Sequence, residues 1–235
     1  MKKLIYSVLL LTLIFTASYA QNETYTENRS VKSFNALSAC CGIDVYISEG
    51  KSSTIRVETN YEEHLPHIIT ETKNGELKIS LTNKNVFKRP QNLWVKVYLS
   101  ASNLIAAKAT SGSDIRSKTP LFADDIKLSA SSGADIDVEL NAGNIECKAS
   151  SGSDIKVKGK ASYASLRASS GSDINLSEMT VGVVDASASS GSDIIVTAME
   201  EINAKASSGG DVVYKGTPKI VNKRERFGGG VKHRK

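Results

Sequence analysis

Cysteine is scarce in this chain, and what there is does not form a framework. The 235 residues contain three cysteines, Cys40, Cys41 and Cys147. An odd and low count excludes a disulfide-dense scaffold, and no histidine lies near any of them in sequence to suggest a metal or nucleophilic role. The geometry of a disulfide disfavours a bridge between adjacent residues. Cys147 is expected to be a small core residue, although its pairing with Cys40 or Cys41, and the redox state of all three, stay open.

Aromatic residues are also few where the sequence is most regular. Between residues 109 and 211 there are two, Phe122 and Tyr163, so glycan binding by aromatic stacking is weakly supported there. The others concentrate in the N-terminal part, where we expect them to serve the core. The residues for which we expect this role are Tyr46, Tyr61, Phe87, Trp94 and Tyr98.

Long apolar runs are absent after the first twenty residues. Lys2 and Lys3 precede an apolar stretch from Leu4 to Phe15, and Ser18-Tyr19-Ala20 resembles a cleavage site. Residues 1–20 are therefore predicted to be a signal peptide. No later segment approaches the length of a membrane-spanning helix. We expect an exported protein, in the periplasm or at the cell surface.

Charge is unevenly distributed along the predicted mature chain. The formal net charge of the full chain is +5, which becomes +3 without Lys2 and Lys3, and residues 219–235 hold seven Lys or Arg against the single Glu225. This basic C-terminal tail could contact anionic lipid or polysaccharide, but a solvated chain end is the simpler expectation. Nucleic acid is not an expected partner, because almost no aromatic residues interleave the basic ones.

Six near-copies of one phrase dominate the second half, for example KASSGSDI and RASSGSDI. Their aspartates recur at intervals of 18 to 21 residues. A fixed period near twenty in strand-like sequence predicts a solenoid whose coils cannot bury their apolar faces alone. The six aspartates are Asp114, Asp135, Asp154, Asp173, Asp193 and Asp211.

Each repeat contains two short alternating segments, which predict two strands per coil. The shared alanines before the turn are Ala109, Ala130, Ala149, Ala168, Ala188 and Ala206. Two residues earlier stand Ala107, Leu128, Cys147, Leu166, Ala186 and Ala204, and four residues earlier stand Ile105, Ile126, Ile145, Ala164, Val184 and Ile202. We expect all three columns to face inward. After the turn, segments such as Ile155-Lys-Val157 form the second strand. A right-handed parallel β-solenoid with about 20 residues per coil is the expected fold.

A glycine occupies the turn of every coil, as expected where a side chain would penalise a positive φ. These glycines are Gly112, Gly133, Gly152, Gly171, Gly191 and Gly209. The repeat solenoid is predicted over residues 101–218. Because proline cannot donate a ladder hydrogen bond, Lys215–Pro218 is expected to close its far end.

Residues 21–100 predict a less regular, β-rich N-terminal part. Residues 39–47 align without a gap onto residues 149–157 and so predict a first solenoid-like motif. Further strands are expected at Thr54–Thr59, Gly75–Leu81 and Leu93–Leu99, with a hairpin turn at Lys73-Asn74-Gly75. Residues 84–91 are expected to be a loop. This part should cover the first coil and prevent end-to-end strand pairing.

The whole pattern resembles the head GIN domain family, a bacterial domain labelled an autotransporter adhesin. The resemblance rests on Gly42-Ile43-Asp44-Val45, on Trp94-Val-Lys-Val-Tyr-Leu99, on the serial Ser-Gly turns and on the closing Tyr214-Lys-Gly-Thr-Pro218. It covers roughly residues 31–235. It implies a β-helix and an adhesive role, and it supplies no catalytic residues. The residues up to 235 predict no C-terminal translocator barrel of the kind that an autotransporter carries, so self-secretion is not expected.

The aspartate row is the one constellation that could bind a ligand. Carboxylates stacked at about 4.8 Å would repel each other by about 1 kcal/mol in water and 3–4 kcal/mol at an effective dielectric of 20. Calcium would relieve this repulsion. The alternative, which we favour, is that each aspartate accepts hydrogen bonds at its turn. Calcium-binding β-rolls place the apolar residue two positions after the aspartate, and here it falls one and three positions after it.

Two histidines, His64 and His67, lie close together but are separated by Leu65 and Pro66. Without a third ligand they are expected to belong to a polar connection. The short, repetitive turns leave no insertion for a catalytic cleft. We therefore assign no catalytic, cofactor or metal residue and expect no enzyme.

The expected function is that of a non-enzymatic exported interaction protein, a cell-surface adhesin with an unidentified macromolecular partner. The alternative is a periplasmic scaffold that maintains the envelope. An enzyme that processes envelope polysaccharide is a distant third. The sequence names neither ligand nor oligomeric state.

Overall fold

The computed structural model describes residues 23–51, 53–82 and 90–234. The predicted signal peptide, most of the expected loop at residues 84–91 and Phe87 lie outside the described residues. Seventeen strands and one 3-10 helix follow in this order: β1 Tyr25–Ser30, β2 Ala36–Cys40, β3 Ile43–Glu49, β4 Thr54–Thr59, η1 Glu62–His67, β5 Ile68–Lys73, β6 Glu76–Leu81, β7 Val95–Ala101, β8 Ala106–Thr110, β9 Asp114–Ser117, β10 Leu121–Ser131, β11 Asp135–Ser150, β12 Asp154–Ser169, β13 Asp173–Ser189, β14 Asp193–Ser207, β15 Asp211–Lys215, β16 Ile220–Arg226 and β17 Gly230–His233.

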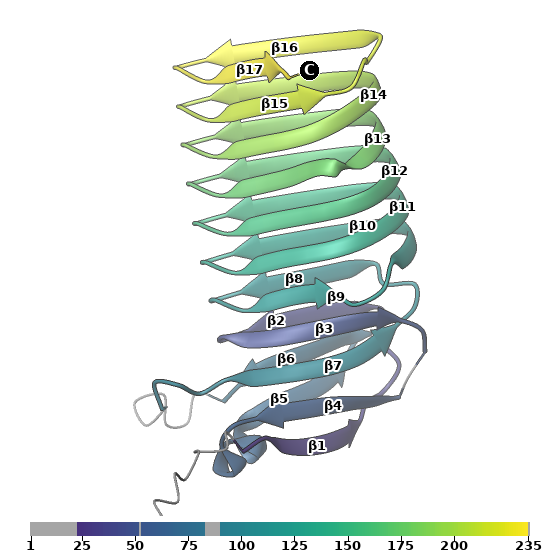
Figure 1. Cartoon of the computed structure of the whole chain (residues 1–235), viewed down its shortest axis with the longest axis vertical. Helices are drawn as coiled ribbons and strands as arrows, with labels where there is room; N and C mark the ends of the chain where they lie inside the picture. Colours follow the sequence, from purple (N-terminus) through teal and green to yellow (C-terminus); the bar gives the residue numbers. More distant parts are fainter. Residues whose placement is uncertain (1–22, 52, 83–89, 235) are drawn as a thin grey trace, which may run out of the picture.

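These strands wind into a rod with two sheet faces (Figure 1). Face 1 consists of the strands that lead into the tight turns of the coils, continued by β6 and β5: β5, β6, β2, β8, β10, the C-terminal parts of β11 to β14, and β16. Face 2 consists of the strands that leave these turns, continued by β7, β4 and β1: β1, β4, β7, β3, β9, the N-terminal parts of β11 to β14, β15 and β17. The predicted parallel β-solenoid is confirmed.

The coils stack so that equivalent residues of the repeat lie side by side. Asp135 pairs with Asp154, Ala149 with Ala168, and Ser150 with Ser169. All three predicted inward columns are buried, with one exception. Ile105 is 49% exposed because β8 begins only at Ala106, and the preceding Leu104 is buried in its place at 4% exposure. The prediction that Ile105 faces the core is therefore wrong.

Each tight turn contains two consecutive residues with positive φ. At the turn of the third repeat, Ser151 has φ 59° and Gly152 has φ 66°, which is the pattern of a type I′ turn. A Cβ on Gly152 would meet no atom within 4 Å, so backbone conformation alone explains this glycine. Ser153, which follows, is fully buried. Its hydroxyl accepts from the Ser150 N–H at 3.0 Å and donates to the Ala130 carbonyl at 2.9 Å.

The N-terminal part extends the solenoid and then covers its end. β2 and β3 form a coil beneath β8 and β9, in which Ala39 stacks on Ala109 and Asp44 on Asp114. Below that coil, β6 and β7 are parallel to β2 and β3, but β5, β4 and β1 are antiparallel to their neighbours. The predicted hairpin is confirmed as β5–β6. The change of strand direction ends the parallel stack and covers its core, as predicted for this region.

The C-terminal tail does not behave as predicted. The prediction that Lys215–Pro218 closes the far end of the solenoid is wrong, because β16 stacks in parallel on β14 and β17 on β15 (Figure 1). Pro218 lies in the connection between the faces, where no ladder bond is needed, and Lys219 N–H donates to the Glu200 carbonyl at 2.8 Å. The basic segment is thus a further paired coil rather than a frayed end, although every residue of β16 is exposed to solvent. In it Glu225 replaces the shared alanine, so this coil ends the apolar core.

Candidate binding surfaces

The six predicted aspartates form one continuous ladder on face 2, and Asp44 extends it to seven. Successive members are paired in register from Asp44 through Asp114, Asp135, Asp154, Asp173 and Asp193 to Asp211. The carboxylates accept hydrogen bonds from the neighbouring coil. Asp154 N–H donates to Asp135, and Asp193 N–H donates to Asp173, each at 3.2 Å. The favoured expectation of hydrogen bonding therefore agrees with the structure, although these donors lie in the next coil rather than in the turn itself.

The ladder is repulsive in its middle and neutralised at its ends. Partial burial, followed by the charges of Asp135 and Asp173, raises the pKa of Asp154. At the C-terminal end Lys232 contacts Asp211 at 2.8 Å, and this hydrogen bond lowers the pKa of Asp211. Near the other end Arg116 contacts Asp114 at 2.7 Å. The uncompensated charge therefore lies in the middle coils.

Metal binding receives no geometric support within residues 23–51, 53–82 and 90–234. In these ranges no three His, Cys, Asp or Glu side chains are grouped so that they could hold an ion. Calcium binding along the ladder, the hypothesis that the sequence disfavours, stays untested, and a melting temperature unchanged by added calcium and by chelator would contradict it. His64 and His67 lie in η1 with ring centroids 5.9 Å apart, in the polar connection between β4 and β5.

The three cysteines fall into two separate environments. Cys40 and Cys41 lie at the first tight turn with their sulfurs 2.6 Å apart. Cys147 is fully buried in β11, and burial raises the pKa of its thiol. β8 and β10 lie between β2 and β11, which places Cys147 beyond the reach of a disulfide to either other cysteine.

The four described aromatic residues expected in the core, Tyr46, Tyr61, Trp94 and Tyr98, are only partly buried and lie outside it instead. Tyr46 and Tyr98 occupy the outward positions of β3 and β7, with their rings stacked at a centroid distance of 5.0 Å. Arg56 packs over the Tyr98 ring at 4.3 Å, and Lys118 packs over Tyr46 at 4.4 Å. The prediction was wrong for this pair because strand alternation, rather than aromatic character, determines which side chains are buried.

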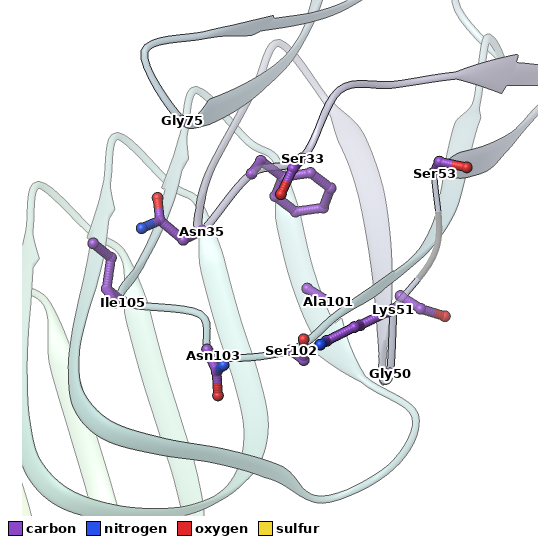
Figure 2. Close-up of a pocket in the computed structure, with 12 residues that line it drawn as sticks. Ser33, Asn35, Gly50, Lys51, Ser53, Gly75, Ala101, Ser102, Asn103 and Ile105 are labelled. Atoms are coloured by element: carbon purple, nitrogen blue, oxygen red, sulfur yellow. The ribbon is translucent and has the colours of Figure 1, made fainter.

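An open recess of about 760 Å³ lies beside the first coils (Figure 2). Connections far apart in sequence meet there: the segments before β2 and β8, the link from β3 to β4, the turn of β5–β6, and the end of β7. Its lining residues are Ser33, Phe34, Asn35, Gly50, Lys51, Ser53, Gly75, Ser100, Ala101, Ser102, Asn103 and Ile105.

The chemistry of this recess is that of hydrogen bonding. Lys51 extends across it in the direction of Ser102 (Figure 2), and the other polar groups are hydroxyls and amides. The lining residues include neither a histidine nor a carboxylate to activate a serine. The recess suits a polar or anionic group that accepts hydrogen bonds. Sequence reasoning missed it because no motif marks it and its segments meet only in the folded chain.

No helix among the described residues is long and apolar enough to cross a membrane. The fold and surfaces define a β-solenoid whose polar side chains are displayed along a rod. The family model described as "Putative auto-transporter adhesin, head GIN domain" matches residues 33–218. The chain therefore belongs to the head GIN domain family, as the sequence resemblance indicated.

Solved structures show the same fold. A "putative adhesin" from Bacteroides fragilis matches with a TM-score of 0.81 at 19% identity, covering 90% of this chain and 97% of that one. A "putative adhesin" from Parabacteroides merdae has a TM-score of 0.72 at 16% identity, covering 92% and 98%. A "Putative lipid binding protein" from Parabacteroides distasonis has a TM-score of 0.68 at 16% identity, covering 92% and 98%. A search of curated proteins finds no match.

Proposed function

We propose that this chain is a non-enzymatic, exported interaction protein that acts as an adhesin at the cell surface. Its family and several structural relatives carry adhesin descriptions, and the proposal extends that description to this chain. The predicted signal peptide supports export.

The observation that carries the proposal is the in-register display of side chains. Coil after coil places equivalent residues at the same position, so each outward position forms a continuous column along the rod. A column of this kind can contact an extended partner at many equivalent points. Multiple weak contacts then add to useful affinity without a deep pocket.

The recess beside the first coils supports the same proposal. Its serines lie among amides and a single lysine rather than beside a general base. A polar terminal group of a macromolecule could be held there by hydrogen bonds. Binding is therefore favoured over catalysis.

Protease shaving of intact cells tests the proposal. An antibody against residues 21–235 should show loss of the protein while a known periplasmic protein survives. Protection until the outer membrane is opened would contradict the adhesin proposal. The periplasmic scaffold, which maintains the envelope without reaching the surface, would then be favoured.

A further inference from the structure

A basic column runs along face 1 from β6 to β16. It occupies the outward position immediately before the shared alanine, where strand pairing keeps successive residues in register. From the N-terminal end the column contains Lys78, Ser38, Lys108, Ser129, Lys148, Arg167, Ser187, Lys205 and Arg224. Every basic member is exposed, and no member from Lys78 to Arg224 is acidic, whereas Glu71 of β5 stands opposite Lys78 at the N-terminal end.

A column of hydroxyl groups runs parallel to it, two residues further along each strand. It contains Thr110, Ser131, Ser150, Ser169, Ser189 and Ser207, and it ends at Arg226 in β16. These side chains lie on the same outward side of face 1 as the basic column, because strand positions two apart face the same way. A donor-rich strip two columns wide therefore lies along the rod.

Carboxylates on face 1 do not neutralise the strip. Glu146 is shared by Lys127 at 3.4 Å, Lys148 at 2.6 Å and Arg167 at 3.6 Å, so one negative charge faces three positive ones. Among the described residues, Lys205 and Arg224 form no ion pair. The strip thus keeps a net positive charge.

A hollow lies over the C-terminal half of the strip. It has a volume of about 490 Å³, and its lining includes Tyr163, Arg167, Asp185, Lys205, Asn222 and Arg224. Its one carboxylate, that of Asp185, accepts from the Tyr163 hydroxyl at 2.6 Å and from the Asn203 amide at 2.9 Å. Four cations, Arg167, Lys205, Lys223 and Arg224, line the hollow together with a tyrosine and amides.

We propose that face 1 binds a linear acidic polysaccharide along the rod axis, with its carboxylate or sulfate groups at the basic column and its hydroxyls at the hydroxyl column. From Lys108 to Arg224 the column spans seven coils, or about 29 Å at roughly 4.8 Å per coil. This assignment rests on the proposed function, since it names the partner class of the same interaction protein.

Other polyanions fit this surface less well. Single-stranded nucleic acid binds by stacking its bases on aromatic side chains, and Tyr163 is the one aromatic residue that lines the hollow. A bilayer needs a broad basic area, whereas Glu146 and Asp185 stand directly beside the basic column. A second copy could present its aspartate ladder, which has the same repeat along the rod. These three are outcomes of the test.

The column itself suggests the variant, because three coils already carry serine at this position. The face 1 variant carries Lys108→Ser, Lys148→Ser, Arg167→Ser and Lys205→Ser. The matched control variant carries Lys118→Ser, Lys156→Ser, Lys158→Ser and Lys215→Ser, at positions on or beside face 2, so that the net charge changes equally in both variants. Probes are polygalacturonate and heparin oligosaccharides, with neutral dextran as a blank, measured by calorimetry and by circular dichroism for folding.

We expect the face 1 variant to bind both acidic probes about 10-fold more weakly or worse, at a cost of a few tenths of a kcal/mol or more per exposed contact. The control should change affinity by less than about 2-fold. Equal losses in both variants would show attraction to net charge alone and overturn the proposal. So would tighter binding of wild type to single-stranded DNA or to anionic vesicles, or a self-associated dimer that the face 1 variant abolishes.

The two proposals fail separately. A wild-type protein that binds neither acidic probe overturns the polysaccharide assignment, whatever its location in the cell. Surface exposure is decided by protease shaving, which does not depend on the probes. Loss of binding in both variants together with a changed circular dichroism spectrum would call for single Lys148→Ser and Lys156→Ser variants, judged by the same criterion.

Discussion

The repeat coils and the N-terminal coils fill the same cross-section in different ways. In the repeats, the column before the tight turn is alanine in every coil, and a hydrogen-bonded serine closes most turns. In the N-terminal part, Leu37 and Leu77 are paired and fully buried, and Ile79 stands opposite the alanine position. In the repeats, regular hydrogen-bonded turns allow a thin core to stabilise each coil. The N-terminal end depends instead on large apolar side chains covered by antiparallel strands.

The largest effect should come from truncating that covered end. Leu77→Ala removes a fully buried side chain and should cost about 3–5 kcal/mol of unfolding free energy. In a solenoid, damage passes chiefly to nearest neighbours. Hydrogen exchange should therefore rise in β5 to β7 while β12 and β13 stay protected. Uniformly faster exchange along the rod would show one cooperative unit and break the comparison.

Gly152, in the turn before β12, and Gly159, within β12, distinguish the energetic cost of backbone conformation from that of steric crowding. Gly152→Ala meets only the cost of a positive φ, about 1 kcal/mol. Gly159→Ala would place its Cβ 2.2 Å from the Leu140 carbonyl oxygen at φ 117°, so the backbone must move and more than about 2 kcal/mol should be lost. Urea unfolding of both variants measures the difference, and equal losses would contradict the crowding explanation.

Cysteine substitutions compare the inside of the repeats with their turns. Cys147→Ser buries a hydroxyl in an apolar column and should cost about 1–3 kcal/mol. The double variant Cys40→Ser and Cys41→Ser places serine where other coils already have it, so less than about 1 kcal/mol should change. Thermal melting under reducing conditions is the measurement. A larger loss in the double variant would mean that the cysteine turn contributes more than the serine turns.

The repeats were predictable because one physical rule acts in every coil. Apolar residues that alternate along the chain and recur with a constant period predict the two strands, the three inward columns and the turn glycines. The rule failed where the period ends. Ile105 lies before the start of its strand, Pro218 lies in a connection between the faces, and the basic tail stacks although its sequence carries no repeat phrase.

The surfaces were predictable only in part, for a similar reason. The aspartate row follows from the repeat itself and could be found by alignment. The recess brings together segments that share no motif. The basic column alternates with serine, so it becomes visible only when strand pairing places Ser38, Lys108 and Ser129 in one line.

The smallest expected change in stability comes from substitutions in the aspartate ladder. The sign of this change should differ between the middle of the ladder and its C-terminal end. The pKa of Asp154 is raised in the folded protein, so its ionised form is disfavoured there. Its stabilising contribution is present below the unfolded-state pKa, about 3.9, and is lost as the pH rises through the folded-state value. Asp154→Asn keeps a hydrogen-bond acceptor without the charge and should raise the melting temperature slightly at pH 7.

Asp211 should respond in the opposite direction. Its hydrogen bond from Lys232 lowers its pKa, so its contribution is present above the unfolded-state pKa and is lost as the pH falls through the folded-state value. Asp211→Asn should lower the melting temperature at pH 7 only slightly, because the pair is exposed to solvent. The melting temperatures of the Asp154→Asn and Asp211→Asn variants, measured at pH 7 and at pH 3, test both predictions. Destabilisation by Asp154→Asn at pH 7 would show that its hydrogen bonds outweigh repulsion, and the middle of the ladder would then resemble its ends.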